Sequence, residues 1–161
     1  MKHKMTFIGL FFLIAAANAS AQVNREDEFG LGLILGEPTG VSLKYWFDEE
    51  RAVDGALAWA LSEDDSFQMH TDYLFHNYRW SNSDEWPVYY GLGALLLFKH
   101  DEGRHHDDNK TVFGFRFPIG MSYLFESNEP FELFFEIAPV LELAPDADLD
   151  LNAAIGLRFY F

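Results

Sequence analysis

The sequence predicts an all-β fold, an eight-stranded antiparallel up-and-down transmembrane β-barrel, and three features point to it. The chain opens with a short apolar segment that has the marks of an export signal. Eight later stretches alternate apolar residues with polar or small ones, which is the period of a β-strand. The last stretch, residues 149–161, exceeds the typical soluble strand of about 5 to 6 residues and suits a tilted crossing of a bilayer, which takes about 9 to 11.

The opening segment predicts a secretory signal peptide. Two lysines precede an apolar run from Met5 to Ala17, and small-residue motifs at residues 17–19 and 19–21 offer two cleavage points. We favour the bond before Gln22. A membrane anchor would need about 18 or more apolar residues, and this run is shorter. Residues 1–21 are therefore expected to be removed.

Residues 22–161 are expected to form one barrel domain, because their length suits a single domain. Without the two lysines of the signal, 9 basic residues face 26 acidic ones, a formal charge of −17. Such a surface makes nucleic acid a poor partner. The chain has no cysteine, so disulfides cannot stabilise it outside the cytoplasm.

The first four stretches are separated by short turn-rich or charged segments. They cover residues 29–35, 41–47, 52–61 and 67–76. Their apolar faces hold Phe29, Leu31, Leu33 and Leu35; Val41, Leu43, Tyr45 and Phe47; Val53, Leu57, Trp59 and Leu61; and Phe67, Met69, Tyr73 and Phe75. Each stretch thus has the single apolar face of a strand in a sheet.

The last four stretches are longer and follow the same rule. They cover residues 88–98, 113–125, 131–143 and 149–161. Pro118 and Pro139 lie inside two of them, and a closed barrel has no free edge on which a proline can sit without losing a ladder hydrogen bond. We therefore expect a local bulge at each proline.

The two faces of the strands decide between a membrane barrel and a soluble one. Charged residues stand beside glycine and alanine on the inward face: Lys44, Asp54, Asp72, Arg116, Glu132, Glu136, Glu142, Asp150 and Arg158. The interior of an eight-stranded barrel is only wide enough for side chains, and bulky apolar residues belong outside only where lipid is outside. Aromatic residues also gather at the predicted lower rim as an interfacial girdle: Phe29, Phe47, Phe75, Tyr90, Tyr123, Phe125, Phe131 and Phe161.

The inward charges are expected to neutralise one another, because a buried charge must be paired. The expected acids are Asp54, Asp72, Glu132, Glu136 and Asp150, and the expected bases are Lys44, Arg116 and Arg158. Residues of catalytic type face inward as well: Ser42, Gln68, His70, Asp72, His76 and Ser122. Their spacing does not bring them together and a filled lumen leaves no room for substrate, so we assign no catalytic residue.

Residues 99–110 are expected to form a solvated extracellular loop between the fifth and sixth strands. Its candidate metal ligands are His100, His105, His106, Asp107 and Asp108. A flexible loop loses much entropy when it forms a site, and nothing in the sequence fixes the ligand geometry. We therefore assign no metal ligand and no cofactor-binding residue.

The hairpin Gly-Glu-Pro-Thr-Gly-Val-Ser-Leu-Lys at 36–44 and the ending Gly-Leu-Arg-Phe-Tyr-Phe at 156–161 carry a family resemblance. The chain resembles the small eight-stranded outer-membrane barrels of the OmpX and OmpA-domain type, and more closely a barrel family of unknown function. The resemblance implies the outer membrane, contact with its lipids and lipopolysaccharide, and assembly by the barrel-assembly machinery through the strand that ends in Phe161. It implies no active site.

The expected function is that of a monomeric barrel for envelope integrity or surface interaction, with no catalysis and no open pore. The alternatives are a lipid-modifying enzyme similar to a lipid A acylhydrolase, a narrow channel, and a metal-binding surface protein. That lipid A enzyme carries a serine two residues from a histidine. Here the residues two after His70, His76, His100 and His106 are Asp72, Tyr78, Glu102 and Asp108, so the motif is absent.

Overall fold

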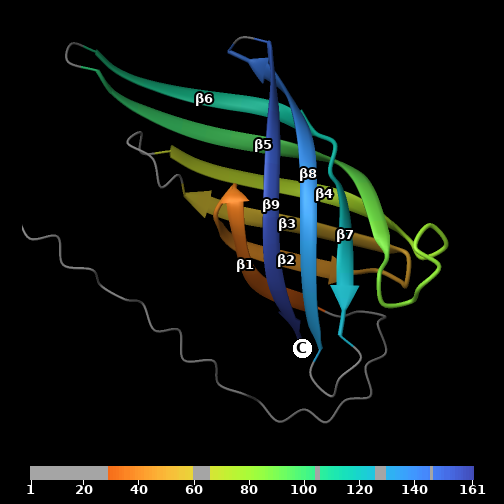
Figure 1. Ribbon diagram of the computed structural model, residues 1–161. Helices are drawn as coiled ribbons and strands as arrows, with labels where there is room; N and C mark the ends of the chain where they lie inside the picture. The colour runs from red at the N-terminus through yellow and green to blue at the C-terminus, as the bar shows by residue number, and fades with distance from the viewer. Residues whose placement is uncertain (1–28, 60–65, 104–105, 126–129, 146) are drawn as a thin grey trace, which may run out of the picture.

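The computed structural model describes residues 29–59, 66–103, 106–125, 130–145 and 147–161 (Figure 1). Its strands are β1 (Phe29–Glu37), β2 (Gly40–Trp46), β3 (Arg51–Trp59), β4 (Ser66–Asn77), β5 (Val88–Gly103), β6 (His106–Arg116), β7 (Ile119–Leu124), β8 (Phe131–Ala144) and β9 (Asp148–Tyr160). In this part of the chain no helix is long and apolar enough to cross a membrane.

The strands form one antiparallel sheet that closes on itself. Its order is β4-β3-β2-β1-β9-β8-β6-β5-β7, and β4 also pairs with β5. β6 and β7 lie end to end, because both pair with β5 on one side and with β8 on the other. The nine strands therefore occupy eight positions around the ring, and the predicted up-and-down barrel is confirmed.

The sixth predicted strand is interrupted at Phe117 and Pro118, but no bulge forms there. Arg116 faces Val140 and Ile119 faces Ile137, so the register with β8 is the same on both sides of the break. Pro139 lies in an unbroken register with β9. The expected bulges are thus wrong. Neither proline has an N–H to donate to a neighbouring strand. The N–H of Phe117 still donates to the carbonyl of Pro139, but Pro139 cannot return the bond. This missing bond lies beside the break at Phe117 and Pro118.

A bulge does occur further along, where Phe113 pairs with Ala144 and Gly114 with Glu142. Residues 99–110 also differ from the predicted loop. They continue β5 and β6 as a paired hairpin, from Lys99 opposite Lys110 to Gly103 opposite His106. The apolar alternation of the sequence fades in this segment, although the pairing of the two strands continues.

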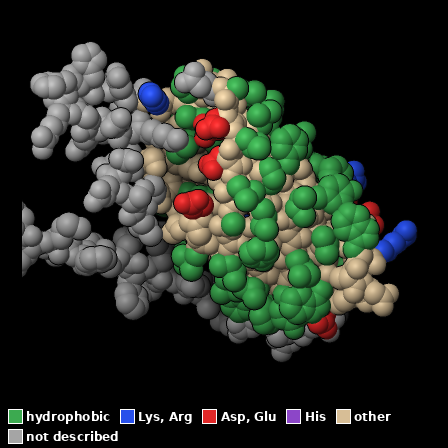
Figure 2. All heavy atoms as spheres, turned by 45° about the horizontal axis from the view of Figure 1, so that its top comes forward, with side chains coloured by type: hydrophobic (Ala, Val, Ile, Leu, Met, Phe, Trp, Pro, Cys, Tyr) green, Lys and Arg blue, Asp and Glu red, His purple; other side chains and the backbone are tan. Residues whose placement is uncertain are grey.

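At most positions the two faces of the sheet confirm the predicted assignment of inward and outward residues. Outward residues are open to the surroundings, as with Leu33 (63% exposed) and Phe135 (50%), whereas the inward Arg116 is fully buried. Apolar side chains cover much of the outer wall in Figure 2. A soluble barrel would place these groups the other way round.

We call the end of the barrel that holds Phe29 and Phe161 the terminal end, and the end where the β5–β6 hairpin projects the hairpin end (Figure 1). Aromatic residues of the predicted girdle contact one another at the terminal end, with Phe29 and Phe161 at 5.5 Å between ring centroids. The connection from β4 to β5 adds Trp80 and Trp86, which the girdle prediction did not include. Trp80 stacks on Tyr90 with a centroid distance of 5.8 Å, and Trp86 lies 4.4 Å from Tyr123.

Large aromatic residues fill the lumen near the terminal end by lying against glycines on neighbouring strands. A β-carbon added to any of three glycines would collide with a ring. It would lie 2.6 Å from the ring of Tyr160 if added to Gly30, 2.3 Å from the ring of Tyr89 if added to Gly120, and 2.3 Å from the ring of Phe134 if added to Gly156. Each glycine stands directly opposite its aromatic partner. The absence of a side chain on one strand makes room for the ring of the next.

Candidate functional site: the ion-pair network of the lumen

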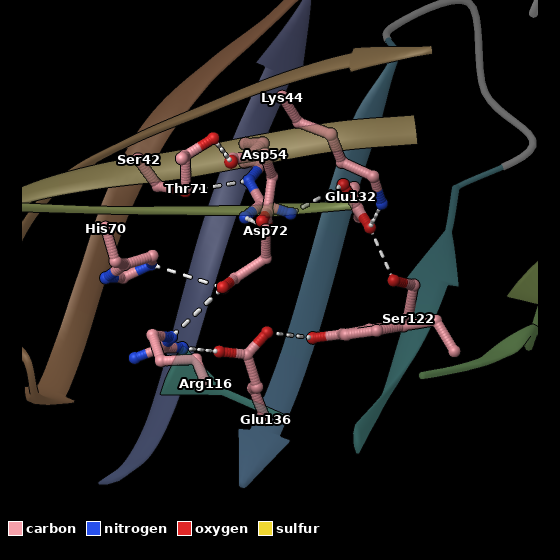
Figure 3. Close-up of polar contacts among 12 residues, drawn as sticks. Ser42, Lys44, Asp54, His70, Thr71, Asp72, Arg116, Ser122, Glu132 and Glu136 are labelled. Atoms are coloured by element: carbon pink, nitrogen blue, oxygen red, sulfur yellow. Dashed lines mark hydrogen bonds and ion pairs between the residues drawn. The ribbon is translucent and has the colours of Figure 1, made fainter. Parts of the chain in front are cut away.

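Seven charged side chains enter the lumen from six strands of the wall, as the alternation predicts. They are Lys44 on β2, Asp54 on β3, Asp72 on β4, Arg116 on β6, Glu132 and Glu136 on β8, and Arg158 on β9. All seven are buried. The contacts drawn in Figure 3 divide them into two clusters, which we name after Glu132 and Arg116.

The Glu132 cluster comprises Lys44, Asp54, Glu132 and Arg158. Lys44 Nζ donates to Glu132 Oε1 over 2.7 Å. Arg158 bridges two acids, with Nη2 at 2.7 Å from Asp54 Oδ2 and Nη1 at 3.3 Å from Glu132 Oε2. Glu132 and Arg158 stand directly opposite each other on β8 and β9, so the register alone brings this acid and this base together.

Neutral and aromatic groups also contact the ions of the Glu132 cluster. The hydroxyls of Ser122 and Tyr160 both donate to Glu132, and Arg158 Nε donates to Ser42 Oγ over 2.9 Å. The guanidinium carbon of Arg158 lies 3.8 Å from the ring centroid of Phe134. Charge-assisted hydrogen bonds and a cation–π contact thus replace the water that these ions lose.

The Arg116 cluster comprises Asp72, Arg116 and Glu136. Arg116 Nη2 donates to Glu136 Oε1 over 2.6 Å, and its Nε donates to Asp72 Oδ2 over 3.1 Å. The hydroxyl of Tyr89 donates to the second oxygen of Glu136 over 3.1 Å. The predicted pairing of lumen acids with lumen bases is therefore present in both clusters.

The residues of catalytic type belong to these clusters or lie beside them. His76 Nε2 lies 3.0 Å from Lys44 Nζ, and His70 Nε2 lies 3.8 Å from Asp72 Oδ2. Ser42 and Ser122 bond to charged members of the Glu132 cluster. Among the described residues, neither serine is hydrogen-bonded to a histidine, so the arrangement lacks the nucleophile–base pair that a triad needs.

Asp150 is a correction, because it lies outside the network. Its side chain is exposed at the hairpin end, where Oδ1 accepts a bond from the N–H of Leu151. β1 ends at Glu37, which pairs with Ala153, so Asp150 stands on a part of β9 that has no β1 beside it. Glu142 is half-buried and faces Asp148.

Within the residues that the structure describes, no group of three or more histidine and acidic side chains could hold a metal ion. The metal ligands that the sequence offers in the β5–β6 hairpin are not among these side chains. His105 lies outside the described residues, and the side chains of His100, His106, Asp107 and Asp108 are likewise not described.

Six buried polar atoms of the described chain have no protein partner. They are Asp54 Oδ1, Gln68 Nε2, His70 Nδ1, His76 Nδ1, Arg116 Nη1 and Asn152 Nδ2. Reasoning from the sequence did not single out Asn152 or the bonding roles of the tyrosine hydroxyls and Ser122. The inward position of Asn152 in the alternating pattern was its only signal.

Comparison with known proteins supports the architecture. The chain is similar to the N-terminal β-barrel domain of Pseudomonas aeruginosa OprF, with a TM-score of 0.65 and 12% identity over 83% of this chain and 96% of that domain. The neisserial surface protein NspA matches with a TM-score of 0.49 and 14% identity over 83% of this chain and 94% of that one. Ail of Yersinia pestis matches with a TM-score of 0.46 and 13% identity over 84% and 99%.

The likeness to the OprF domain shows a shared barrel fold and nothing finer at that identity. No curated protein matches the chain. A family model described as "Protein of unknown function (DUF3996)" matches residues 20–159. The match covers nearly the whole barrel, in keeping with the resemblance to a barrel family of unknown function, and the chain therefore belongs to the DUF3996 family.

Proposed function

We propose that the protein is an integral outer-membrane barrel with a structural or surface-interaction role and without catalysis. In this proposal residues 1–21 are a cleaved signal peptide, and residues 22–161 insert as a monomer among outer-membrane lipids and lipopolysaccharide. The terminal end faces the periplasm and the hairpin end faces outward. The observation that carries the proposal is a buried network, inside a wall of exposed apolar residues, in which every charged side chain contacts an opposite charge.

An open pore is disfavoured because the terminal end is filled. Trp46, Tyr89, Phe134 and Tyr160 are all buried there, around the Glu132 cluster. Pores that conduct freely have about 16 to 18 strands, whereas an interior of eight strands is filled by side chains. The proposed role therefore depends on the wall and the outer loops rather than on transport.

A lipid-modifying enzyme is disfavoured by where the histidines point. Such an enzyme needs its base at the lipid-facing surface, and both His70 and His76 are buried in the lumen. Among the side chains that the structure describes, no histidine lies on the outer wall. The lumen histidines contact ions of the network instead.

Electrical recording from the purified barrel tests the absence of a pore. The folded protein in planar bilayers should give no stable single-channel steps, and fractionated cells should hold it as a heat-modifiable band in the outer membrane. The Glu132→Ala variant, refolded in the same way, is the control for leaks caused by a damaged lumen. Reproducible steps from the unaltered protein that disappear in Arg116→Leu or Glu136→Gln would replace the structural role with a channel.

Deletion of Phe161 tests recognition by the assembly machinery. Phe161 is exposed at the end of the strand beside Phe29, so its removal leaves the lumen network in place. We expect export to continue and outer-membrane assembly to fail, with the chain accumulating in the periplasm. Phe161→Tyr keeps an aromatic end and serves as the matched control. A normal heat-modifiable band from the deleted chain would contradict this reading.

A further inference from the structure

The part of β9 nearest the hairpin end has a neighbouring strand on one side only. β1 pairs with β9 as far as Glu37, which stands opposite Ala153. On the other side β8 continues to pair, up to Glu142 opposite Asp148. Figure 1 shows β9 continuing past the end of β1. Residues 148–152 therefore form an open edge, beside which none of the described strands pairs, and we call it the β9 edge.

The register shows which N–H groups of the β9 edge point to the open side. The carbonyl of Pro139 on β8 accepts the N–H of Phe117, which lies across β8 from β9, so the backbone of Pro139 is directed away from β9. In an antiparallel pair the residue opposite then directs its own N–H and C=O away as well, and that residue is Leu151. Leu149, two residues along the strand, does the same. Both N–H groups therefore face the open side.

Aspartate side chains occupy both of these N–H groups. Asp148 Oδ1 accepts the N–H of Leu149 over 2.8 Å, and Asp150 Oδ1 accepts the N–H of Leu151 over 2.8 Å. Side-chain hydrogen bonds of this kind compete with strand pairing for the backbone donor. Where β1 lies beside β9, the corresponding positions hold Asn152, Ala154, Gly156 and Arg158. The acids of β9 thus stand at the positions that precede an N–H without a neighbouring strand.

An unprotected edge of this kind can pair with a further strand, and its exposed leucines add apolar surface to such a contact. Leu149 is 74% exposed and Leu151 is 57% exposed. A second copy of this chain fits, because an antiparallel edge is complementary to itself about a twofold axis. In the register that uses both N–H groups of each copy, Leu149 of one copy faces Leu151 of the other. The two Asp150 carboxylates then face each other, and like charges directly opposite repel.

We propose that Asp148 and Asp150 block the β9 edge and keep two copies of the barrel from joining through it. Each carboxylate occupies an N–H that the strand of a second copy would need. The charge of the carboxylates also opposes the approach of the same edge from another copy. The inference rests on the monomer of the proposed function, for which it supplies a cause. It does not depend on which end of the barrel faces outward.

Light scattering from the protein refolded in detergent micelles tests the block, because it measures the protein mass of each particle. The Asp148→Ala/Asp150→Ala variant frees both N–H groups. The Glu37→Ala/Glu142→Ala variant is the matched control, since it removes two other carboxylates from the hairpin end. Glu37 is the last residue of β1, and Glu142 stands on β8 opposite Asp148. The Asp148→Asn/Asp150→Asn variant removes the charge but keeps a side-chain oxygen that can accept the N–H.

We expect the Asp148→Ala/Asp150→Ala variant to form a dimer, with double the protein mass of the unaltered chain, as its concentration is raised. The unaltered protein, the glutamate control and the asparagine variant should stay monomeric under the same conditions. Adding Leu149→Pro to the alanine variant should restore the monomer, because proline removes an N–H on the open side and no ladder bond to β8. Heat-modifiability shows that each variant is folded, and Asp150→Ala alone replaces the double variant if that one is not.

Each other result overturns a stated part. A folded alanine variant that stays monomeric at every concentration overturns the block. Dimers of the glutamate control, or dimers that survive Leu149→Pro, overturn the β9 edge as the place of contact. An asparagine variant as dimeric as the alanine variant overturns the role of the two hydrogen bonds. Dimers of the unaltered protein overturn the monomer of the proposed function, and they overturn the block as well if Leu149→Pro separates them.

Discussion

The Glu132 cluster and the Arg116 cluster bury the same kinds of ions but differ in how completely those ions are bonded. Glu132 receives hydrogen bonds from Lys44, Arg158, Ser122 and Tyr160, so both of its oxygens are used. Arg116 bonds two carboxylates but leaves Nη1 without a protein partner. Glu132 is bonded entirely by protein donors, whereas Arg116 needs a water, as does Asp54 Oδ1 in the Glu132 cluster.

The difference matters because a buried ion pair gains little over apolar packing until every remaining donor and acceptor is satisfied. Inside the Glu132 cluster, a lost partner cannot be replaced, since Trp46 and Tyr160 fill the space around it. In the Arg116 cluster, Arg116 Nη1 already lacks a protein partner, and ordered water is the usual partner of such a buried group. The same substitution should therefore cost more at the terminal end than toward the hairpin end.

Arg158→Leu should have the largest effect. It leaves Asp54 and Glu132 without their guanidinium and removes the contact with Phe134. Breaking a buried pair by removing one partner costs about 3 to 5 kcal/mol, so the urea midpoint of the barrel refolded in lipid vesicles should fall sharply. Tryptophan fluorescence follows the transition.

Arg51→Leu is the control for losing any arginine. Arg51 pairs with Asp48 in the exposed β2–β3 turn, where its hydrogen bond lowers the pKa of the Asp48 carboxyl. Exposed pairs of this kind contribute little, so the midpoint should barely move. An equal shift in Arg51→Leu and Arg158→Leu would contradict the closed network.

Arg116→Leu should destabilise the barrel by less, about 1.5 to 3 kcal/mol, the range for a lost hydrogen bond to a charged group. The water that Arg116 Nη1 needs as a partner can bond to Asp72 and Glu136 once the arginine is gone, which limits the cost. The same urea titration measures it, with Arg158→Leu in parallel. A larger loss in Arg116→Leu than in Arg158→Leu would reverse the ranking of the two clusters.

The strands and their facing could be read from the sequence because alternation with period two records which side of the wall each residue takes. Lys44, Arg116 and Arg158 were placed inside correctly for that reason. Which acid pairs with which base could not be read from the sequence so directly. Register around a closed ring decides it, and that register places Arg158 opposite Glu132 while it leaves Asp150 beyond the end of β1.

Two other differences also come from neighbours that a single strand does not reveal. Residues 99–110 read as a loop because their apolar alternation fades, yet pairing between β5 and β6 continues through them. The sequence predicts a bulge at Pro139 because proline has no N–H for the ladder. In the structure the N–H that Pro139 lacks would have bonded to Phe117, which lies where the neighbouring strand is already interrupted. Both depend on what lies across the sheet.

The two buried tyrosines give the finest test of the comparison. Tyr160 donates to Glu132, and Tyr89 donates to Glu136 over 3.1 Å. Replacing each with phenylalanine keeps the ring that lies against Gly30 or Gly120 and removes only the hydroxyl. Tyr160→Phe should cost about 1.5 kcal/mol or more, because the bond is to a charged group that has no substitute donor.

Tyr89→Phe should cost less, about 0.5 to 1 kcal/mol, because a water bound beside Arg116 Nη1 can take the place of its hydroxyl at Glu136. Urea midpoints of the two single variants, measured in the same vesicles, give the difference directly, and the double variant checks that the two losses add. Equal costs would mean that both clusters are equally enclosed. A stronger loss in Tyr89→Phe would place the dry end of the lumen around Arg116, opposite to the arrangement argued from the unpaired atoms.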